Sequence, residues 1–153
     1  MEYRIREARI TEIDRFGALC REMGAICKSD SSIDAEGLLR QLVYIPNATV
    51  LLAEAGREIA GGAILALRPS VSVGGFIGTV DLLVVKNGHD PEKVATALIT
   101  EIVRSAKNKG CVQVEVALGK NAPLRAYWQS FGFNQASAHT YKLGVAARAP
   151  ATR

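Results

Sequence analysis

Residues 79–133 constrain the fold more tightly than any other part of the chain, because their pattern fits one order of secondary-structure elements. The run Thr79–Val85 is rich in β-branched residues and almost entirely apolar, as expected for a strand buried on both faces. After a short turn, Asp90 and Pro91 provide a helix N-cap and a first-turn proline. We therefore predict a buried strand, a tight loop and a helix that begins beside Asp90.

The same segment continues with a second strand and a further helix. The first helix is predicted to end at Gly110, and residues 112–118 then alternate between apolar and polar or small side chains, the period of a strand. A last helix is predicted over residues 121–131 and ends at the pair Gly132–Phe133. The first helix has an apolar residue at every fourth position, at Val94, Leu98, Ile102 and Ala106.

Two parallel strands joined by a helix form a crossover unit. The helix of such a unit begins where the first strand ends, so its first N–H groups point toward a possible ligand. Helix N-termini attract anions through these N–H groups and through the helix dipole. The segment therefore predicts a site for an anionic group near residue 90.

These residues resemble the core of the GNAT superfamily of acyl-CoA N-acyltransferases. The ending Tyr127–Phe133 is similar to the family's aromatic-Tyr-x-x-Leu-Gly-Phe ending, and Leu83–Val85 is similar to the end of its fourth strand. The spacing from Val85 to Ala95 equals the family's spacing from that strand to the last small residue of its Q/R-x-x-G-x-G/A pyrophosphate loop. The resemblance implies an α/β fold with a mixed, splayed sheet, formed as one domain by residues 1–145, with a disordered tail over residues 146–153.

The resemblance also implies a cosubstrate, acetyl-CoA or another acyl-CoA, and an amine acceptor, either a small molecule or a peptide. The acceptor would enter between residues 25–32 and the Gly74–Gly75 loop. Pantetheine would pair with the end of the first strand, the pyrophosphate would face the first turn of the helix, and the last helix would add further contacts. The implied cosubstrate residues are Leu83, Val84, Val85, Lys93, Val94, Ala95, Thr96, Asn121 and Trp128.

The predicted pyrophosphate loop departs from the family pattern. Asp90 stands where the family has Gln or Arg, and Lys93 stands where it has Gly. Pro91 has no N–H to offer, and the carboxylates of Asp90 and Glu92 add negative charge. Asp90 can itself cap the N–H groups that a phosphate needs, whereas Lys93 can direct an ammonium group at a phosphate.

Asp81 is the first candidate for a general base. It interrupts the apolar strand, where burial would disfavour its ionised form, and bases of the family often come from this strand. The alternative is a structural carboxylate bonded to neighbouring backbone. Glu115 on the next strand is the second candidate, with an outward-facing polar position as its alternative.

Candidates for a general acid are less clear, because the position of the family's tyrosine, four residues before the glycine of Gly132–Phe133, is Trp128. Indole is no useful acid. Tyr127 is one residue away, which rotates a helical side chain by roughly 100°, so Tyr127 is either the acid or a packed aromatic residue. His139 and Tyr141 are weaker candidates from a last strand.

Two loop residues have both a ligand-binding and a simpler interpretation. His89 lies at the predicted mouth of the cosubstrate site, where it either contacts phosphate or is exposed to solvent. Asn121 either bonds a pantetheine amide or serves as an N-cap.

Composition excludes several classes of protein. The chain is 48% hydrophobic and 22% charged, without an apolar run near the ~20 residues of a membrane span. Its net charge of +4 is spread along the sequence, and no basic block interleaved with aromatic residues suggests nucleic-acid binding. The three cysteines have no metal-ligand spacing, which favours reduced thiols in a cytoplasm and no metal site.

The remaining sequence fits the same fold. We predict a strand over residues 3–10, a helix from Thr11, a second helix after Ser31 or Ser32, a hairpin around Gly56–Arg57 and a last strand over residues 140–145. The function predicted is an acyl-CoA-dependent N-acetyltransferase acting by direct transfer. The alternative is a GNAT-fold binding or regulatory module that has lost acyl-CoA catalysis. Either form could be a homodimer joined by sheet extension through the last strand.

Overall fold

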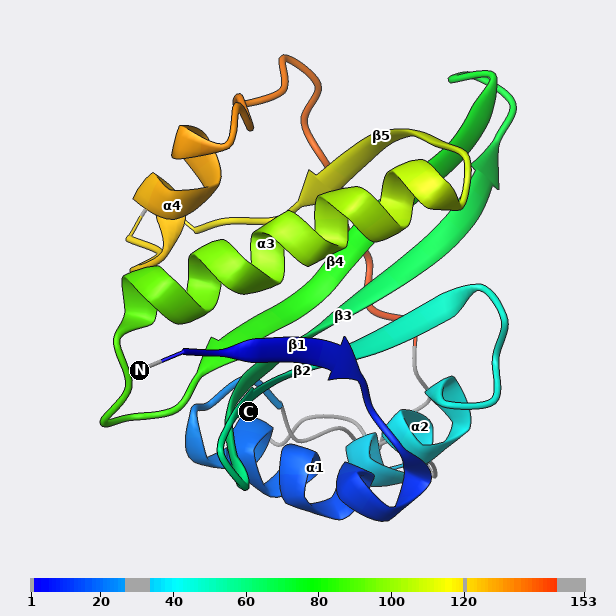
Figure 1. The fold of residues 1–153 in the computed structure, drawn as a ribbon. Coiled ribbons are helices and arrows are strands. Elements are labelled where there is room, and N and C mark those ends of the chain that lie inside the picture. Colours follow the sequence, from blue (N-terminus) through cyan, green and yellow to red (C-terminus); the bar gives the residue numbers. More distant parts are fainter. Residues whose placement is uncertain (1, 27–33, 120, 146–153) are drawn as a thin grey trace, which may run out of the picture.

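The structure is a computed structural model that describes residues 2–26, 34–119 and 121–145. It contains one sheet, with helices on both faces (Figure 1). In chain order the elements are β1 (Arg4–Glu7), the 3₁₀ helix η1 (Ile10–Glu12), α1 (Ile13–Glu22), α2 (Ala35–Leu42), β2 (Ala48–Ala55), β3 (Glu58–Ser70), β4 (Gly75–Val85), α3 (Pro91–Asn108), β5 (Cys111–Val116) and α4 (Arg125–Ser130).

The five strands lie in the order β1-β2-β3-β4-β5. Neighbours from β1 to β4 pair antiparallel, and β4 and β5 pair parallel across the connection through α3. The predicted crossover unit is therefore confirmed. Its helix α3 begins after Asp90, whose side chain caps it, and has Pro91 in its first turn, as predicted.

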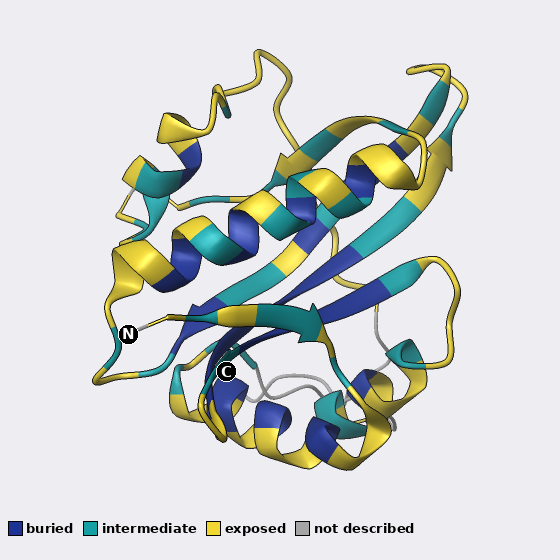
Figure 2. Cartoon of the chain, viewed as in Figure 1, coloured by how far each residue is buried: buried dark blue, intermediate teal, exposed yellow. Residues whose placement is uncertain are grey.

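Each face of the sheet carries its own hydrophobic core. The strands supply side chains alternately to the two faces, because successive residues of a strand point in opposite directions. In β2, for example, Leu51 packs with α3, whereas Leu52 packs with α1. Figure 2 shows the sheet-facing stripes of α1 and α3 in the colour of buried residues. The three central strands β2, β3 and β4 therefore carry buried side chains on both faces, as the apolar run in β4 predicted.

Two adjacent glycines of β3 allow helices to approach the sheet from opposite sides. A Cβ atom at Gly61 would lie 2.9 Å from Val94 Cγ1 in the first turn of α3. A Cβ atom at Gly62 would overlap the ring of Phe16 in α1 and would lie 2.8 Å from the Leu51 carbonyl oxygen. Both glycines pair with the last residues of β4, so they fix the helices around the end of that strand.

A partly buried ion cluster joins β1, η1 and β2. The guanidinium of Arg6 donates to Glu12 Oε1 over 2.7 Å and to Glu54 Oε2 over 2.7 Å, and Arg9 N donates to Glu12 Oε1 over 2.8 Å. Glu12 is only 6% exposed. The hydrogen bonds from Arg6 lower the pKa of Glu12 to about 2, although burial opposes this shift.

Several predicted boundaries are wrong. The last helix begins at Arg125, after an exposed turn, rather than at Asn121, and Leu124 precedes it as N-cap. Residues 140–145 form no strand, and Tyr141 is 94% exposed. The homodimer expected through that segment stays a prediction. The proposed start of α2 at Ser31 or Ser32, Cys27 and the tail over residues 146–153 lie outside the described residues, and α2 is capped by Asp34.

Within the parts of the chain that the structure describes, no helix is both long and apolar enough to cross a membrane.

We predict that Gly62→Ala lowers the free energy of unfolding by about 1–3 kcal/mol, because the added methyl group forces Phe16 away from the sheet. Urea unfolding measures this loss. Gly144→Ala is the matched control, since nothing lies within 4 Å of a Cβ atom there, and it should change stability by less than about 0.5 kcal/mol. Equal stability of the Gly62→Ala variant and the parent would contradict the close approach.

We also predict a loss of stability in acid that depends on Glu12. Its pKa in the folded protein lies below the ordinary value of 4.5, so the unfolded chain binds more protons between these values. The stabilisation is present above pH 4.5 and is lost as the pH falls toward 2, by roughly 3 kcal/mol in total. Unfolding free energies measured from pH 6 to 2 should fall less steeply for Glu12→Gln than for the exposed-site control Glu22→Gln.

Candidate functional site

The sheet opens halfway along β4. β5 pairs with β4 only from Phe76 to Val80, where Val80 faces Val116 at the end of β5. β4 continues to Val85 while the chain after β5 turns away toward α4 (Figure 1). The second half of β4 is therefore paired with β3 on one side, and on the other side it has no strand partner among the described residues. This unpaired edge of β4, beside the diverging chain after β5, is here called the gap.

The gap begins at a β-bulge. Ile64 of β3 pairs with Leu82 and Leu65 pairs with Val80, so Asp81 is an extra residue in β4. Residues two apart in a regular strand share a face, yet Val80 packs with α3 whereas Leu82 packs with the α1 layer. The bulge thus turns Asp81 and Leu82 toward the same face, and both line one cavity beside α1 and α2.

The expected burial of Asp81 is wrong. Asp81 is exposed, because the bulge carries it out of the regular strand. The residue does occupy the point where β4 leaves β5.

Beyond the bulge, alternate backbone groups of β4 face the gap. Lys86 N donates to Ala60 O on β3 over 2.8 Å, so the polar backbone groups of Val84, two residues earlier, also face β3. Those of Leu83 and Val85 point the other way, toward the gap. An extended ligand lying beside β4 would find these two residues as its hydrogen-bonding partners.

The N-terminus of α3 is capped by its own chain. Asp90 Oδ1 accepts from Glu92 N over 3.0 Å and from Lys93 N over 3.4 Å, as the sequence predicted. Pro91 precedes these residues and has no N–H. Lys93 and Thr96 are exposed, whereas Val94 and Ala95 are fully buried against the sheet. The first turn of α3 therefore offers an anion mainly the side chain of Lys93.

His89 is fixed within the loop before α3. Its Nδ1 lies 3.1 Å from Tyr3 Oη and its Nε2 lies 3.1 Å from Glu58 Oε2. Glu58 also accepts from Lys86 Nζ over 2.7 Å. Only 7% of the His89 side chain is exposed, so the expectation of a solvent-exposed histidine is wrong. The chain of contacts joins the loop to β1 and to the β2–β3 turn.

The remaining candidates do not line the cavity that contains Asp81. Glu115 is exposed and accepts from Thr79 Oγ1 over 3.3 Å and from Arg68 over 3.5 Å. Trp128 is 1% exposed and packs edge-on against Phe133, with ring centroids 5.0 Å apart. Tyr127 is half-buried against the same core. The position of Trp128 favours a structural role, and Tyr127 stays a candidate acid.

Asn121 is exposed in the turn before α4, so its proposed N-cap role is wrong. His139 and Tyr141 are exposed in an irregular segment.

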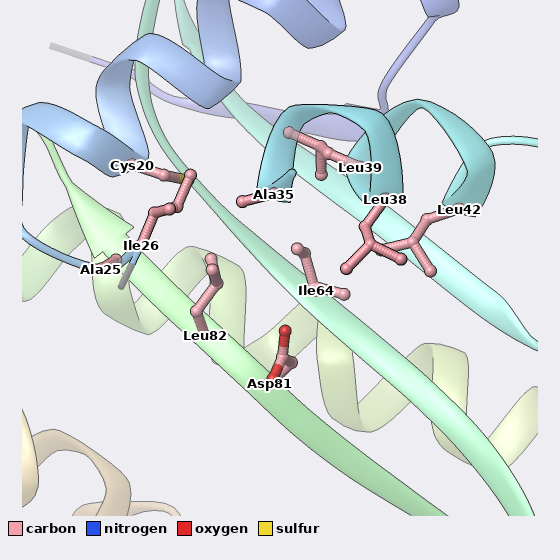
Figure 3. Close-up of a pocket in the computed structure, with 10 residues that line it drawn as sticks. All are labelled: Cys20, Ala25, Ile26, Ala35, Leu38, Leu39, Leu42, Ile64, Asp81 and Leu82. Atoms are coloured by element: carbon pink, nitrogen blue, oxygen red, sulfur yellow. The ribbon is translucent and has the colours of Figure 1, made fainter. Parts of the chain in front are cut away.

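The cavity beside Asp81, here called the α1–α2 cavity, has a volume of about 190 Å³. Figure 3 shows the carboxylate of Asp81 between Leu82 and the leucines of α2. Cys20 and Ile26 lie across the cavity from those leucines. The sequence indicated the region after α1 but missed the α2 wall. The signal available in the sequence was the group of leucines at positions 38, 39 and 42. In the structure Leu39 is buried in the core, whereas Leu38 is 47% exposed and lines the cavity. Gly74 and Gly75 lie at the far end of β4 and do not line the cavity.

Residues 18–133 match the acetyltransferase (GNAT) family. Since this match covers most of the sequence, the chain belongs to the GNAT acetyltransferase family. No curated protein matches the chain.

Solved structures agree with the family assignment at the level of the fold. A ribosomal-protein-alanine N-acetyltransferase from Brucella melitensis biovar Abortus 2308 has a TM-score of 0.77 at 18% identity, covering 95% of this chain and 100% of that one. An aminoglycoside acetyltransferase from an uncultured soil metagenomic sample, in complex with sisomicin, has a TM-score of 0.72 at 18% identity, with 94% and 97% covered. A predicted acetyltransferase with acetyl-CoA from Clostridium acetobutylicum has a TM-score of 0.72 at 16% identity, with 93% and 96% covered. The predicted α/β GNAT fold is thereby confirmed.

Proposed function

We propose that the protein is an acyl-CoA-dependent N-acyltransferase that transfers an acyl group, in the simplest case acetyl, directly to an amine. The observation that carries the proposal is the bulge at Asp81. It places a carboxylate at the point where the gap between β4 and β5 begins and turns that carboxylate toward the α1–α2 cavity. An acyl donor in the gap and an amine in the cavity would meet there.

The gap suits the extended pantetheine arm of an acyl-CoA. Its amide groups would pair with the backbone groups of Leu83 and Val85 as an added strand does. The family assignment supports this cosubstrate, and the Clostridium acetobutylicum neighbour was solved with acetyl-CoA. Lys93 at the start of α3 would contact the pyrophosphate.

In the proposed reaction the amine nitrogen attacks the thioester carbonyl carbon. A C–N bond forms, the C–S bond breaks, the nitrogen loses a proton and the CoA thiolate gains one. Asp81 receives the proton of the bound ammonium, directly or through a water molecule, so that a neutral amine attacks. Proximity in the ternary complex supplies a further part of the barrier reduction.

Direct transfer is supported by the state of Cys20, a thiol that lines the cavity close to Asp81. Burial, together with the charge of Asp81, raises the pKa of Cys20 to about 12. At neutral pH only about one molecule in 10⁵ would carry the thiolate, which is the nucleophilic form. A covalent acyl-cysteine intermediate at Cys20 is therefore disfavoured. We also propose a cytoplasmic location, on the ground that the three cysteines show no metal-ligand spacing and are odd in number.

The alternative function is a GNAT-fold binding module without acyl-CoA catalysis. It is favoured by one observation, the capping of the α3 N-terminus by Asp90. In that case the first turn of α3 needs no phosphate, and the helix end is a purely structural element.

We predict that acetyl-CoA binds in the micromolar range and that Asp81→Asn retains this affinity while kcat falls about 100-fold, because the variant cannot accept the ammonium proton. Isothermal titration measures binding and an amine-acetylation assay measures turnover. Glu7→Gln, at an exposed carboxylate on β1, is the matched control and should keep kcat within about threefold. No heat on titration, with an unchanged Tm, would favour the binding module.

Charge reversal at the helix cap distinguishes the two functions. In the enzyme, Asp90→Arg should tighten CoA about tenfold, since it frees two N–H groups and adds a cation beside the pyrophosphate. It should also cost about 1 kcal/mol of stability through loss of the cap. Asp14→Arg on α1 makes the same change in net charge at a distance and should leave CoA affinity unaltered. A loss of stability without any gain in CoA affinity would support the module.

A further inference from the structure

The α1–α2 cavity is open to solvent and combines one carboxylate with an otherwise largely apolar lining. Its walls come from Cys20 and Ile26 on one side and from Leu38 and Leu42 of α2 on the other, and its floor comes from Ile64 and Leu82. Figure 3 shows that the carboxylate of Asp81 faces the space between these walls. Among the described residues that line the cavity, Asp81 is the only one with an acidic or basic group other than the Cys20 thiol. The lining is therefore complementary to a single positive charge attached to hydrocarbon.

The same lining disfavours two polar kinds of acceptor. A phosphorylated amino sugar would bring an anion beside Asp81, and the described lining residues include no lysine or arginine to neutralise it. A polyhydroxylated polyamine would leave hydroxyl and ammonium groups against leucine and isoleucine side chains. A polar group held against such side chains loses its hydrogen bonds to water without gaining others. The described part of the lining thus disfavours both.

The volume of the cavity suits a small hydrocarbon group. An apolar cavity of about 150 Å³ accommodates benzene, and the α1–α2 cavity has a volume of about 190 Å³. A phenyl ring with a short alkyl chain therefore fills it, with the chain reaching the carboxylate at the cavity wall.

We propose that the acceptor is a monoamine with an apolar body, of the arylalkylamine class, held with its nitrogen at Asp81 and its hydrocarbon between α1 and α2. The proposal rests on the acyltransferase function and adds the substrate class to it. The ammonium donates to the Asp81 carboxylate, and the apolar body is removed from water against the leucines of α2.

The test compares acceptors at saturating acetyl-CoA. Phenylethylamine should have a kcat/KM at least about tenfold higher than glucosamine 6-phosphate or sisomicin. Leu38→Lys places a like charge in the cavity wall at a partly exposed helix position, so it should lower kcat/KM for phenylethylamine about tenfold. Gln41→Lys adds the same charge to the same helix at an exposed position outside the cavity and should leave kcat/KM unchanged.

Acetyl-CoA affinity is measured separately for the parent and both variants and should be the same in all three. Transfer that favours the polar acceptors, or a Leu38→Lys variant as active as Gln41→Lys, would overturn the substrate class while the acyltransferase function stands. Failure to bind acetyl-CoA would instead overturn the acyltransferase function, and the substrate class with it.

Discussion

The extra residue at position 81 is the constraint on which the rest of the site depends. β4 pairs with β3 along nearly its whole length, so it cannot leave the sheet, and β5 must diverge for a ligand to enter. A bulge increases the local twist of a strand and bends it, which allows β4 to part from β5 without losing β3. The same extra residue reverses the facing of the following side chains, so Leu82 joins the core beneath α1. Opening of the sheet and orientation of Asp81 thus have a single cause.

The start of α3 shows a competition between folding and ligand binding for the same N–H groups. A capping carboxylate contributes about 1 kcal/mol to helix stability, and Asp90 obtains this from the N–H groups of Glu92 and Lys93. A pyrophosphate that used them would have to displace Asp90. In the proposed enzyme, more of the CoA affinity therefore comes from pairing along β4 and from Lys93 than from the helix N-terminus. The contacts of His89 with Tyr3 and Glu58 hold the loop in place for either role.

Local sequence patterns predicted the elements that have strong periodicity. They failed where the structure of a segment depends on contacts with residues far away in the sequence. α3 was predicted to within a few residues because its cap, first-turn proline and apolar stripe agree. The bulge at Asp81 is defined by the pairing of β4 with β3 and cannot be recognised in an apolar run of sequence. The residue was therefore expected to be buried. Residues 140–145 alternate as a strand does, yet a strand also needs a partner edge and none is paired with them among the described residues. The close approach at Gly62 depends on Phe16, which lies far away in sequence.

The position of Asp81 between solvent and an apolar enclosure suits the step that the proposed reaction requires. A carboxylate buried in the strand would lose the solvation of its charge, whereas an exposed one keeps its charge without that cost. An alkylammonium ion that binds there moves from water to a less polar space, in which its hydrocarbon part packs against the cavity lining. The charged form of its nitrogen is less favourable in that space than in water. Loss of the proton at that boundary gives the neutral amine at the end of the β4–β5 gap. The geometry thus couples binding of an apolar amine to its activation, which a deeply buried base could not do without first paying to desolvate two charges.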